Sequence, residues 1–112
     1  MVTTITRPDL EVLMASGAVV VVDALPADYF AQQHLPGALN LVEPDVDELA
    51  AELLPDRDAV IVTYCSNTAC GNSSAVARRL ERLGYTDVRT YREGIQDWVE
   101  AGNATAGSRV AS

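Results

Sequence analysis

The stretch "AVIVTYCSNTACGNSSAVARRL", residues 59–80, decides the fold class of this chain. It opens with an apolar, β-branched run, 59–64, which predicts a strand buried on both faces. A polar segment holding both cysteines follows. Val76, Leu80 and Leu83 then recur at helical spacing, and Gly84 ends a helix predicted over 73–83. A strand, a short loop and a helix in this order are typical of a βαβ unit.

The same alternation of strand and helix extends in both directions from this stretch. Strands are predicted at 3–6, 18–24, 38–41 and 87–91, and helices at 7–17, 26–35, 45–54 and 93–102. We expect one α/β domain over residues 1–103, with a central, mostly parallel sheet of about five strands and helices on both faces. Residues 104–112 are small and polar, and they predict a flexible C-terminal tail.

The charge and hydropathy of the chain exclude several classes of function. The formal charge over 112 residues is −8, and no Lys is present. This negative charge disfavours binding to nucleic acid or to an anionic membrane surface, and without Lys a Schiff-base mechanism is excluded. No apolar run approaches the ~20 residues of a membrane span, and the N-terminus lacks a signal-peptide pattern. We therefore expect a cytoplasmic protein with reduced cysteines.

Cys65 directly follows the predicted strand 59–64, at the sheet edge where parallel α/β folds bind their ligands. Inward-pointing amides of the next turn and the start of the next helix should lower the pKa of its thiol. The thiolate would then be available as a nucleophile. From spacing alone, a small buried apolar residue at a strand end is an equally good interpretation.

Cys70 lies five positions after Cys65. The pair could close a small disulfide, act as a nucleophile and a resolving thiol, or be unrelated. We expect Cys70 to be a bystander or an oxidation partner instead of the primary nucleophile. No metal site is expected, because the chain has one His and no second pair of cysteines. No cofactor is implied.

Three separated stretches together resemble the rhodanese-like domain family of single-domain sulfurtransferases. They are "VVVVDALPADYFAQQHLPGALNL" (19–41), the stretch 59–91 with its Tyr-Cys step, and "EGIQDWVEAG" (93–102). The resemblance implies the rhodanese α/β fold and a mechanism of sulfur transfer. In that mechanism, a loop cysteine takes the outer sulfur of a donor such as thiosulfate and becomes a persulfide. It then passes this sulfur to a nucleophilic acceptor.

Carried over residue by residue, the resemblance assigns the nucleophile to Cys65. It also implies an active-site loop whose amides hold the persulfide or an oxyanion: Ser66, Asn67, Thr68, Ala69, Cys70, Gly71, Asn72 and Ser73. Asp23 and His34 match the first motif, where we expect hydrogen bonds that fix turns instead of chemistry. Trp98 is expected in the core.

The loop departs from the family's commonest form, Cys-x-x-Gly-x-Arg-(Ser/Thr). It is longer, and no Arg lies between Cys65 and Ser73. Without that Arg an oxyanion donor loses a charge-assisted contact. We therefore expect weak turnover of thiosulfate, or a different donor such as a persulfide on a protein. Gly71 stands where related phosphatases with a Cys-x5-Arg loop have Arg, so phosphatase and arsenate reductase activities are disfavoured.

Three hypotheses of function remain. The first is a sulfurtransferase or persulfide carrier using Cys65, whose partner is thiosulfate, a small persulfide, or a protein thiol or persulfide. The second is a redox module in which Cys65 and Cys70 interconvert between dithiol and disulfide. The third is a non-catalytic rhodanese-like domain for binding or regulation. The oligomeric state is not predicted.

Overall fold

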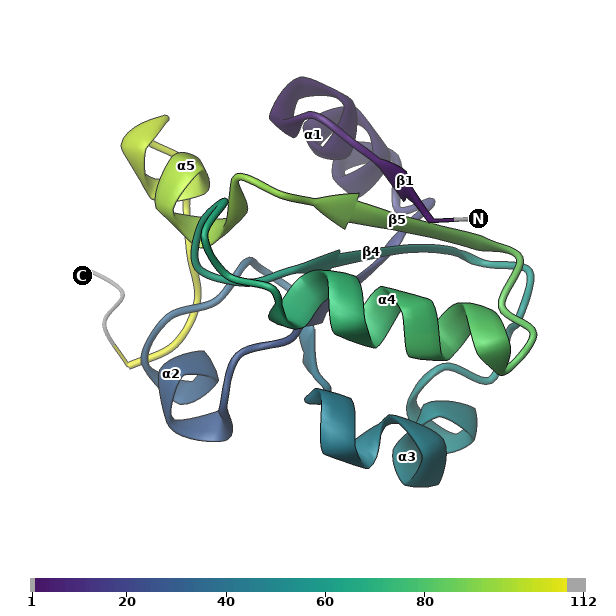
Figure 1. The fold of residues 1–112 in the computed structure, drawn as a ribbon. Helices are drawn as coiled ribbons and strands as arrows, with labels where there is room; N and C mark the ends of the chain where they lie inside the picture. Colours follow the sequence, from purple (N-terminus) through teal and green to yellow (C-terminus); the bar gives the residue numbers. More distant parts are fainter. Residues whose placement is uncertain (1, 109–112) are drawn as a thin grey trace.

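A five-stranded parallel sheet forms the centre of the fold in the computed structural model, which describes residues 2–108 (Figure 1). The strand order is β1-β5-β4-β2-β3, and every neighbouring pair is parallel. The strands are β1 (Thr3–Thr4), β2 (Val20–Asp23), β3 (Leu39–Asn40), β4 (Val60–Tyr64) and β5 (Asp87–Tyr91). The predicted α/β fold with a parallel sheet is confirmed.

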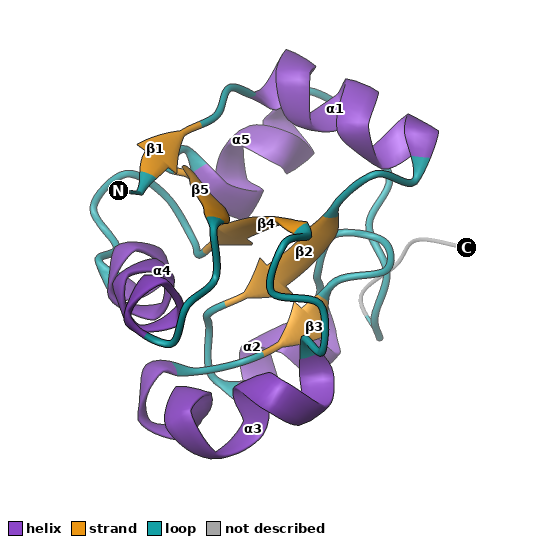
Figure 2. Cartoon of the chain, turned by 90° about the vertical axis from the view of Figure 1, so that its right-hand side faces the viewer, coloured by secondary structure: helices purple, strands orange, loops and turns teal. Residues whose placement is uncertain are grey.

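Helices cover both faces of the sheet, with α1 and α5 on one side and α3 and α4 on the other (Figure 2). Because side chains alternate along a strand, Ile61 of β4 packs with the α3–α4 side, whereas Val62 and Tyr64 pack with the α1–α5 side. The helices are α1 (Arg7–Ser16), α2 (Ala27–Gln32), α3 (Val46–Leu53), α4 (Asn72–Arg82) and α5 (Gly94–Glu100), and a 3-10 turn, η1 (Glu43–Asp45), precedes α3.

The helix predicted over 26–35 is shorter than expected, because α2 ends at Gln32. Gln33 is already extended, with φ −162°. His34 then leaves the helical path to pair with Ala106: the His34 amide donates to the Ala106 oxygen at 3.0 Å, and the Ala106 amide donates back at 2.8 Å. A partner far along the chain therefore replaces the last helical turn.

Part of the predicted tail, 104–112, contacts the domain. The Trp98 indole N–H donates to the Ala104 oxygen at 2.8 Å, and the Ser108 amide donates to the Ala31 oxygen at 2.9 Å. Trp98 itself is buried in the core on the α1–α5 side, as predicted. Residues 109–112 of the predicted tail lie outside the described residues, and the flexibility of 104–112 stays a prediction.

Two negative findings hold for residues 2–108. No helix in this part of the chain combines the length and the apolar character that crossing a bilayer requires. The same part contains no group of three or more His, Cys, Asp or Glu side chains arranged to hold a metal ion.

Candidate functional site

The carboxyl ends of β4 and β5 meet at one edge of the sheet, where Tyr64 pairs in register with Tyr91. Cys65 and Arg92 are the next residues of the two strands and therefore leave the sheet at this same edge. The loop after β4 runs over residues 65–71, and α4 begins at Asn72. Two residues of the predicted loop, Asn72 and Ser73, thus belong to the first turn of α4.

The N-terminal end of α5 holds the start of this loop by its backbone. The Ile95 amide donates to the Cys65 oxygen at 2.9 Å, and the Gln96 amide donates to the Ser66 oxygen at 3.0 Å. Gly94 has φ +68°, and a Cβ there would overlap the carbonyl groups of Cys65 and Ser66. Only glycine fits a left-handed backbone so close to another chain segment. The position of Cys65 is therefore set by α5.

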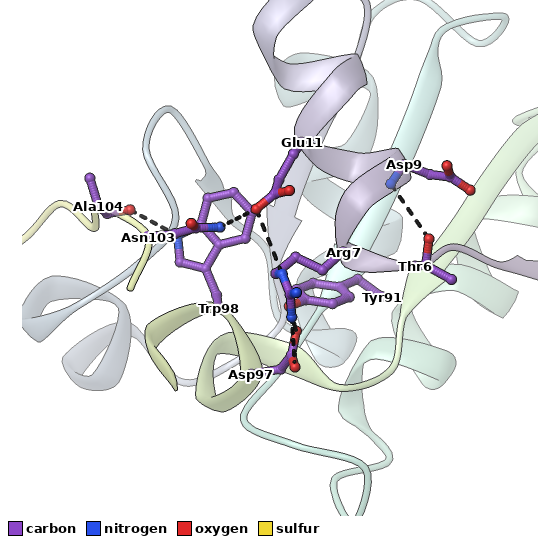
Figure 3. A network of polar contacts seen from close by, with 9 residues as sticks. All are labelled: Thr6, Arg7, Asp9, Glu11, Tyr91, Asp97, Trp98, Asn103 and Ala104. Atoms are coloured by element: carbon purple, nitrogen blue, oxygen red, sulfur yellow. Dashed lines mark hydrogen bonds and ion pairs between the residues drawn. The ribbon is translucent and has the colours of Figure 1, made fainter. Parts of the chain in front are cut away.

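A polar network fixes α5 to α1 and β5 (Figure 3). Arg7 donates to both carboxylate oxygens of Asp97, at 3.1 and 2.9 Å, and the Tyr91 hydroxyl donates to Asp97 at 2.5 Å. The hydrogen bond from Tyr91, together with the Arg7 guanidinium, lowers the pKa of Asp97 despite its partial burial. The ionised Asp97 thereby links α5, which holds the start of the cysteine loop, to α1 and β5.

Cys65 is buried, with 1% of its surface exposed. Its Sγ lies 3.3 Å from the Cys70 oxygen and 3.5 Å from the Ser73 Oγ. Burial raises the pKa of the Cys65 thiol, and a hydrogen bond to Cys70 raises it further, whereas the Ser73 hydroxyl and amide oppose the shift. The expected lowering of this pKa was wrong, because loss of solvation outweighs the donors at the start of α4.

The pKa of the Cys70 thiol is shifted in the opposite direction, downward. Its partial burial would raise the pKa of the thiol, but hydrogen bonds from the Cys65 thiol and from the Asn72 and Ser66 amides lower it overall. Hydrogen bonds to a thiolate favour the charged form. Both cysteines are free. Of the two sulfur atoms, that of Cys70 is therefore the one that more readily holds negative charge.

The outer part of the loop is organised by Asn67. Its side-chain oxygen accepts from the Ala69 amide at 3.0 Å, and its backbone oxygen accepts from the Cys70 amide at 3.1 Å. Its side-chain amide donates to the Gln96 side chain at 3.0 Å. Beyond this turn the loop is exposed, and it borders a pocket of about 160 Å³. The lining residues are Thr68, Ala69, Cys70, Gly71, Ser73, Ser74 and Arg92.

Asp23 is fully buried and pairs with Tyr64. The Tyr64 hydroxyl donates to Asp23 at 2.6 Å and accepts from the Leu35 amide at 3.0 Å, while the Leu25 amide donates to the second Asp23 oxygen at 2.8 Å. Burial raises the pKa of Asp23, although these donors oppose the shift. Asp23 thus fixes the turn after β2, and none of these hydrogen bonds reaches Cys65.

His34 makes a hydrogen bond and a ring contact within its own segment. Its Nδ1 lies 2.7 Å from the Phe30 oxygen, and its ring stacks on the Phe30 ring with centroids 3.9 Å apart. Together with the backbone pairing to Ala106, these contacts close the turn after α2. The arrangement agrees with the interpretation of His34 as a hydrogen-bonded turn residue.

Three residues at the site were not found from the sequence: Gly94, Gln96 and Arg92. Gly94 lies in the quoted "EGIQDW" motif, but nothing there shows that its Cα touches the cysteine loop. For Arg92 the sequence carries a usable signal. It follows the strand predicted over 87–91, and the carboxyl ends of parallel strands lie at the same edge of a sheet.

Comparisons with known proteins agree on one family. The sequence profile of the rhodanese-like domain matches residues 6–101. The thiosulfate sulfurtransferase PspE of Escherichia coli is 31% identical over 77 residues, which cover 68% of this chain and 70% of PspE. The structure of BH2092 from Bacillus halodurans superimposes with a TM-score of 0.88 at 24% identity, covering 96% of this chain and 79% of that one. This last likeness shows the fold alone.

A further relative is a longer protein named for a different role. The HTH-type transcriptional regulator Rv0324 of Mycobacterium tuberculosis is 34% identical over 98 residues, which cover 88% of this chain. The chain spans only 42% of the length of that regulator. The similarity therefore concerns one part of a longer protein.

Proposed function

This chain belongs to the rhodanese-like domain family, and on that premise we propose that it transfers sulfur through a persulfide on Cys65. The observation that carries the proposal is the placement of Cys65. It follows the central strand β4, α5 holds its carbonyl group, and its sulfur lies against Cys70 and Ser73. The relative PspE, a thiosulfate sulfurtransferase, supports sulfur transfer as the type of reaction.

The opposite pKa shifts of the two cysteines suggest how the nucleophile forms. The pKa of the Cys70 thiol is lowered and that of the Cys65 thiol is raised, and the Cys65 thiol donates a hydrogen bond to Cys70. In the proposed sequence Cys70 loses its proton first, and the proton of Cys65 then passes to Cys70, which leaves a thiolate on Cys65. Cys70 therefore acts as the base that activates Cys65, which is how a neighbouring base activates a nucleophilic thiol in general.

The Cys65 thiolate then attacks the outer sulfur of the donor. With thiosulfate, the sulfur–sulfur bond breaks, its electron pair leaves with sulfite, and Cys65 becomes a persulfide. With a small organic persulfide or a protein persulfide, the leaving group is a thiolate. A nucleophilic acceptor next attacks the outer sulfur of the Cys65 persulfide and restores the Cys65 thiolate. The Ser73 hydroxyl and amide, which face the Cys65 sulfur, hold the persulfide during the cycle.

We also place this reaction in the cytoplasm. The proposed chemistry needs both thiols reduced, and a reducing compartment keeps them so. The sulfur donor is thiosulfate, a small persulfide or a protein persulfide, and the acceptor is a thiol or another nucleophile.

A turnover assay tests the proposal. The protein is supplied with thiosulfate or a small persulfide, and with cyanide as the acceptor, and thiocyanate is measured. Cys65→Ser should lose activity by roughly a thousandfold or more. Cys70→Ser should retain transfer at a reduced rate. A Cys65→Ser variant that keeps the wild-type rate would refute the role of Cys65.

The contact between Cys65 and Cys70 favours a second candidate, a dithiol–disulfide module. Dilute hydrogen peroxide would oxidise the two thiols to a disulfide with release of water, and the intact mass would fall by two hydrogen atoms. Cys70→Ser should abolish this loss. If the wild-type pair stays fully reduced at peroxide levels that oxidise free cysteine, this candidate fails.

The regulator Rv0324 favours a third candidate, a domain for binding or regulation without catalysis. In that case the cysteine loop would be a recognition surface, and Cys65→Ser would leave partner binding intact while no thiocyanate formed in either form of the protein. Turnover that depends on Cys65 would argue against this candidate.

A further inference from the structure

The pocket beside the cysteine loop is small, with room for a small anion. Its volume is about 160 Å³, whereas pockets for drug-sized ligands run from about 300 to 1,000 Å³. Its lining includes the outer part of the loop with Cys70, and it also includes Arg92, the first residue after β5. A small molecule held here lies against Cys70, which in turn contacts Cys65.

Arg92 is the basic residue that lines this pocket within residues 2–108. Its side chain is exposed, and in this part of the chain no hydrogen bond or ion pair holds its guanidinium. Arg79, by contrast, is neutralised by two carboxylates: it binds Glu43 at 3.1 Å and Asp47 at 3.0 Å. The charge of Arg92 is therefore available to an anion in the pocket.

We propose that Arg92 binds the oxyanion end of an anionic sulfur donor such as thiosulfate, in place of the arginine that the cysteine loop lacks. The inference rests on the proposed function. A guanidinium fork can donate two hydrogen bonds to neighbouring oxygens of a sulfonate group. Because Tyr64 and Tyr91 are in register, Arg92 and Cys65 leave the sheet side by side. A guanidinium group that directly follows β5 thus takes the place of the arginine that the cysteine loop lacks.

The proposal assigns Arg92 a defined part in the reaction. While the Cys65 thiolate attacks the outer sulfur of thiosulfate, the breaking sulfur–sulfur bond leaves its electron pair on sulfite. Arg92 binds the oxygens of this departing sulfite group. It therefore favours the binding of the thiosulfate dianion, and it stabilises the negative charge that develops on sulfite. When the donor is a neutral persulfide, RS–SH with an uncharged R group, the leaving group is the thiolate RS⁻. This donor offers no oxyanion to Arg92.

The test compares two donors across matched variants. Arg92→Gln should lower kcat/KM for thiosulfate about tenfold and for the neutral 2-hydroxyethyl persulfide no more than about twofold. With thiosulfate, the kcat/KM of Arg92→Lys should lie between the values for Arg92→Gln and wild type, because Lys keeps the positive charge but cannot donate the paired hydrogen bonds of a guanidinium group. Arg82→Gln removes the same charge from the far end of α4 and should leave both donors unaffected. Equal losses for both donors, or none, would overturn the role of Arg92.

A binding measurement separates this inference from the proposed function. Thiosulfate is titrated into Cys65→Ser, which cannot form the persulfide, and amide shifts of the loop are followed by NMR. The affinity should fall about tenfold when Arg92→Gln is added to this background. If wild type transfers sulfur from neither donor but binding requires Arg92, the proposed function fails and the anion site stands. Binding that is absent in Cys65→Ser, or unchanged without Arg92, would overturn the inference.

Discussion

The two halves of the cysteine loop are neighbours in the sequence but are held in different ways. In the inner half, 65–67, the carbonyl groups of Cys65 and Ser66 accept hydrogen bonds from α5, and the Asn67 side chain donates to α5. In the outer half, 68–71, the Ala69 and Cys70 amides donate hydrogen bonds to Asn67, within the loop itself. The inner half is buried or partly buried, whereas most of the outer half is exposed.

This difference separates two tasks that one short loop has to perform. The inner half fixes a buried thiol whose pKa is raised by its surroundings. The outer half carries Cys70, whose pKa is lowered, and borders the pocket with Arg92. We infer that the inner half positions the nucleophile and that the outer half activates it and receives the donor. Substitutions in the two halves should therefore have different effects.

The largest effect is expected where α5 meets the inner half. Gly94→Ala places a Cβ against the carbonyl groups of Cys65 and Ser66 at a positive φ, and it should lower the free energy of unfolding by about 3 kcal/mol. Gly37→Ala is the matched control. Its φ is +76°, but a Cβ there meets nothing within 4 Å, so it should cost only about 1 kcal/mol. Urea denaturation of both variants measures the difference, and equal losses would show that α5 does not support the loop.

A smaller effect is expected one step away, in the network that holds α5. The pKa of Asp97 is lowered in the folded protein, so its ionised form stabilises the fold above the usual Asp pKa, and this contribution is lost as the pH falls through the lowered value. Asp97→Asn should therefore lower the free energy of unfolding by about 1 kcal/mol near neutral pH. The difference in this free energy between the variant and wild type should shrink below about pH 4.

The control for this pH dependence is Asp87→Asn, which removes a more exposed pair with Arg89. We expect a cost of about 0.5 kcal/mol or less there. Unfolding measured between acidic and neutral pH distinguishes the two variants. A cost for Asp97→Asn that does not change with pH would contradict the assignment of an ionised Asp97.

The smallest effect on stability is expected for Cys70→Ser, at roughly 0.5 kcal/mol, but this change should alter the reactivity of Cys65. In wild type, iodoacetamide should modify Cys70 at lower pH than Cys65, because their pKa values are shifted in opposite directions. In Cys70→Ser, Cys65 loses a hydrogen bond and a nearby charge that both raise its pKa. The alkylation profile of Cys65, followed by peptide mapping, should then move to lower pH. An unchanged profile would show that Cys70 does not control Cys65.

Much of the fold is predictable because it depends on local pattern. The runs of β-branched residues around β2 (Val20–Asp23) and β4 (Val60–Tyr64) indicate buried strands wherever they occur. The end of α2 is not predictable in this way. It depends on the pairing of His34 with Ala106, a contact between distant parts of the chain that leaves no mark in the local sequence.

The candidate site shows the same division. Motifs indicate Cys65 and its loop, because their residue types and order are local. The direction of the Cys65 pKa shift depends on how deeply its sulfur is buried and on its contact with Cys70, and neither quantity can be read from spacing. Arg92 joins the pocket only through the register of two strands. Sequence motifs thus indicate the proposed nucleophile, Cys65, but they do not reveal its environment.

The most direct test of the central claim is the intact mass of the protein after treatment with a sulfur donor. Wild type, Cys65→Ser and Cys70→Ser are each incubated with thiosulfate or a small persulfide, and then weighed before and after addition of cyanide. We predict that wild type and Cys70→Ser gain the mass of one sulfur atom that cyanide removes, and that Cys65→Ser gains none. A cyanide-labile sulfur on Cys65→Ser, or its absence from both other proteins, would contradict the account.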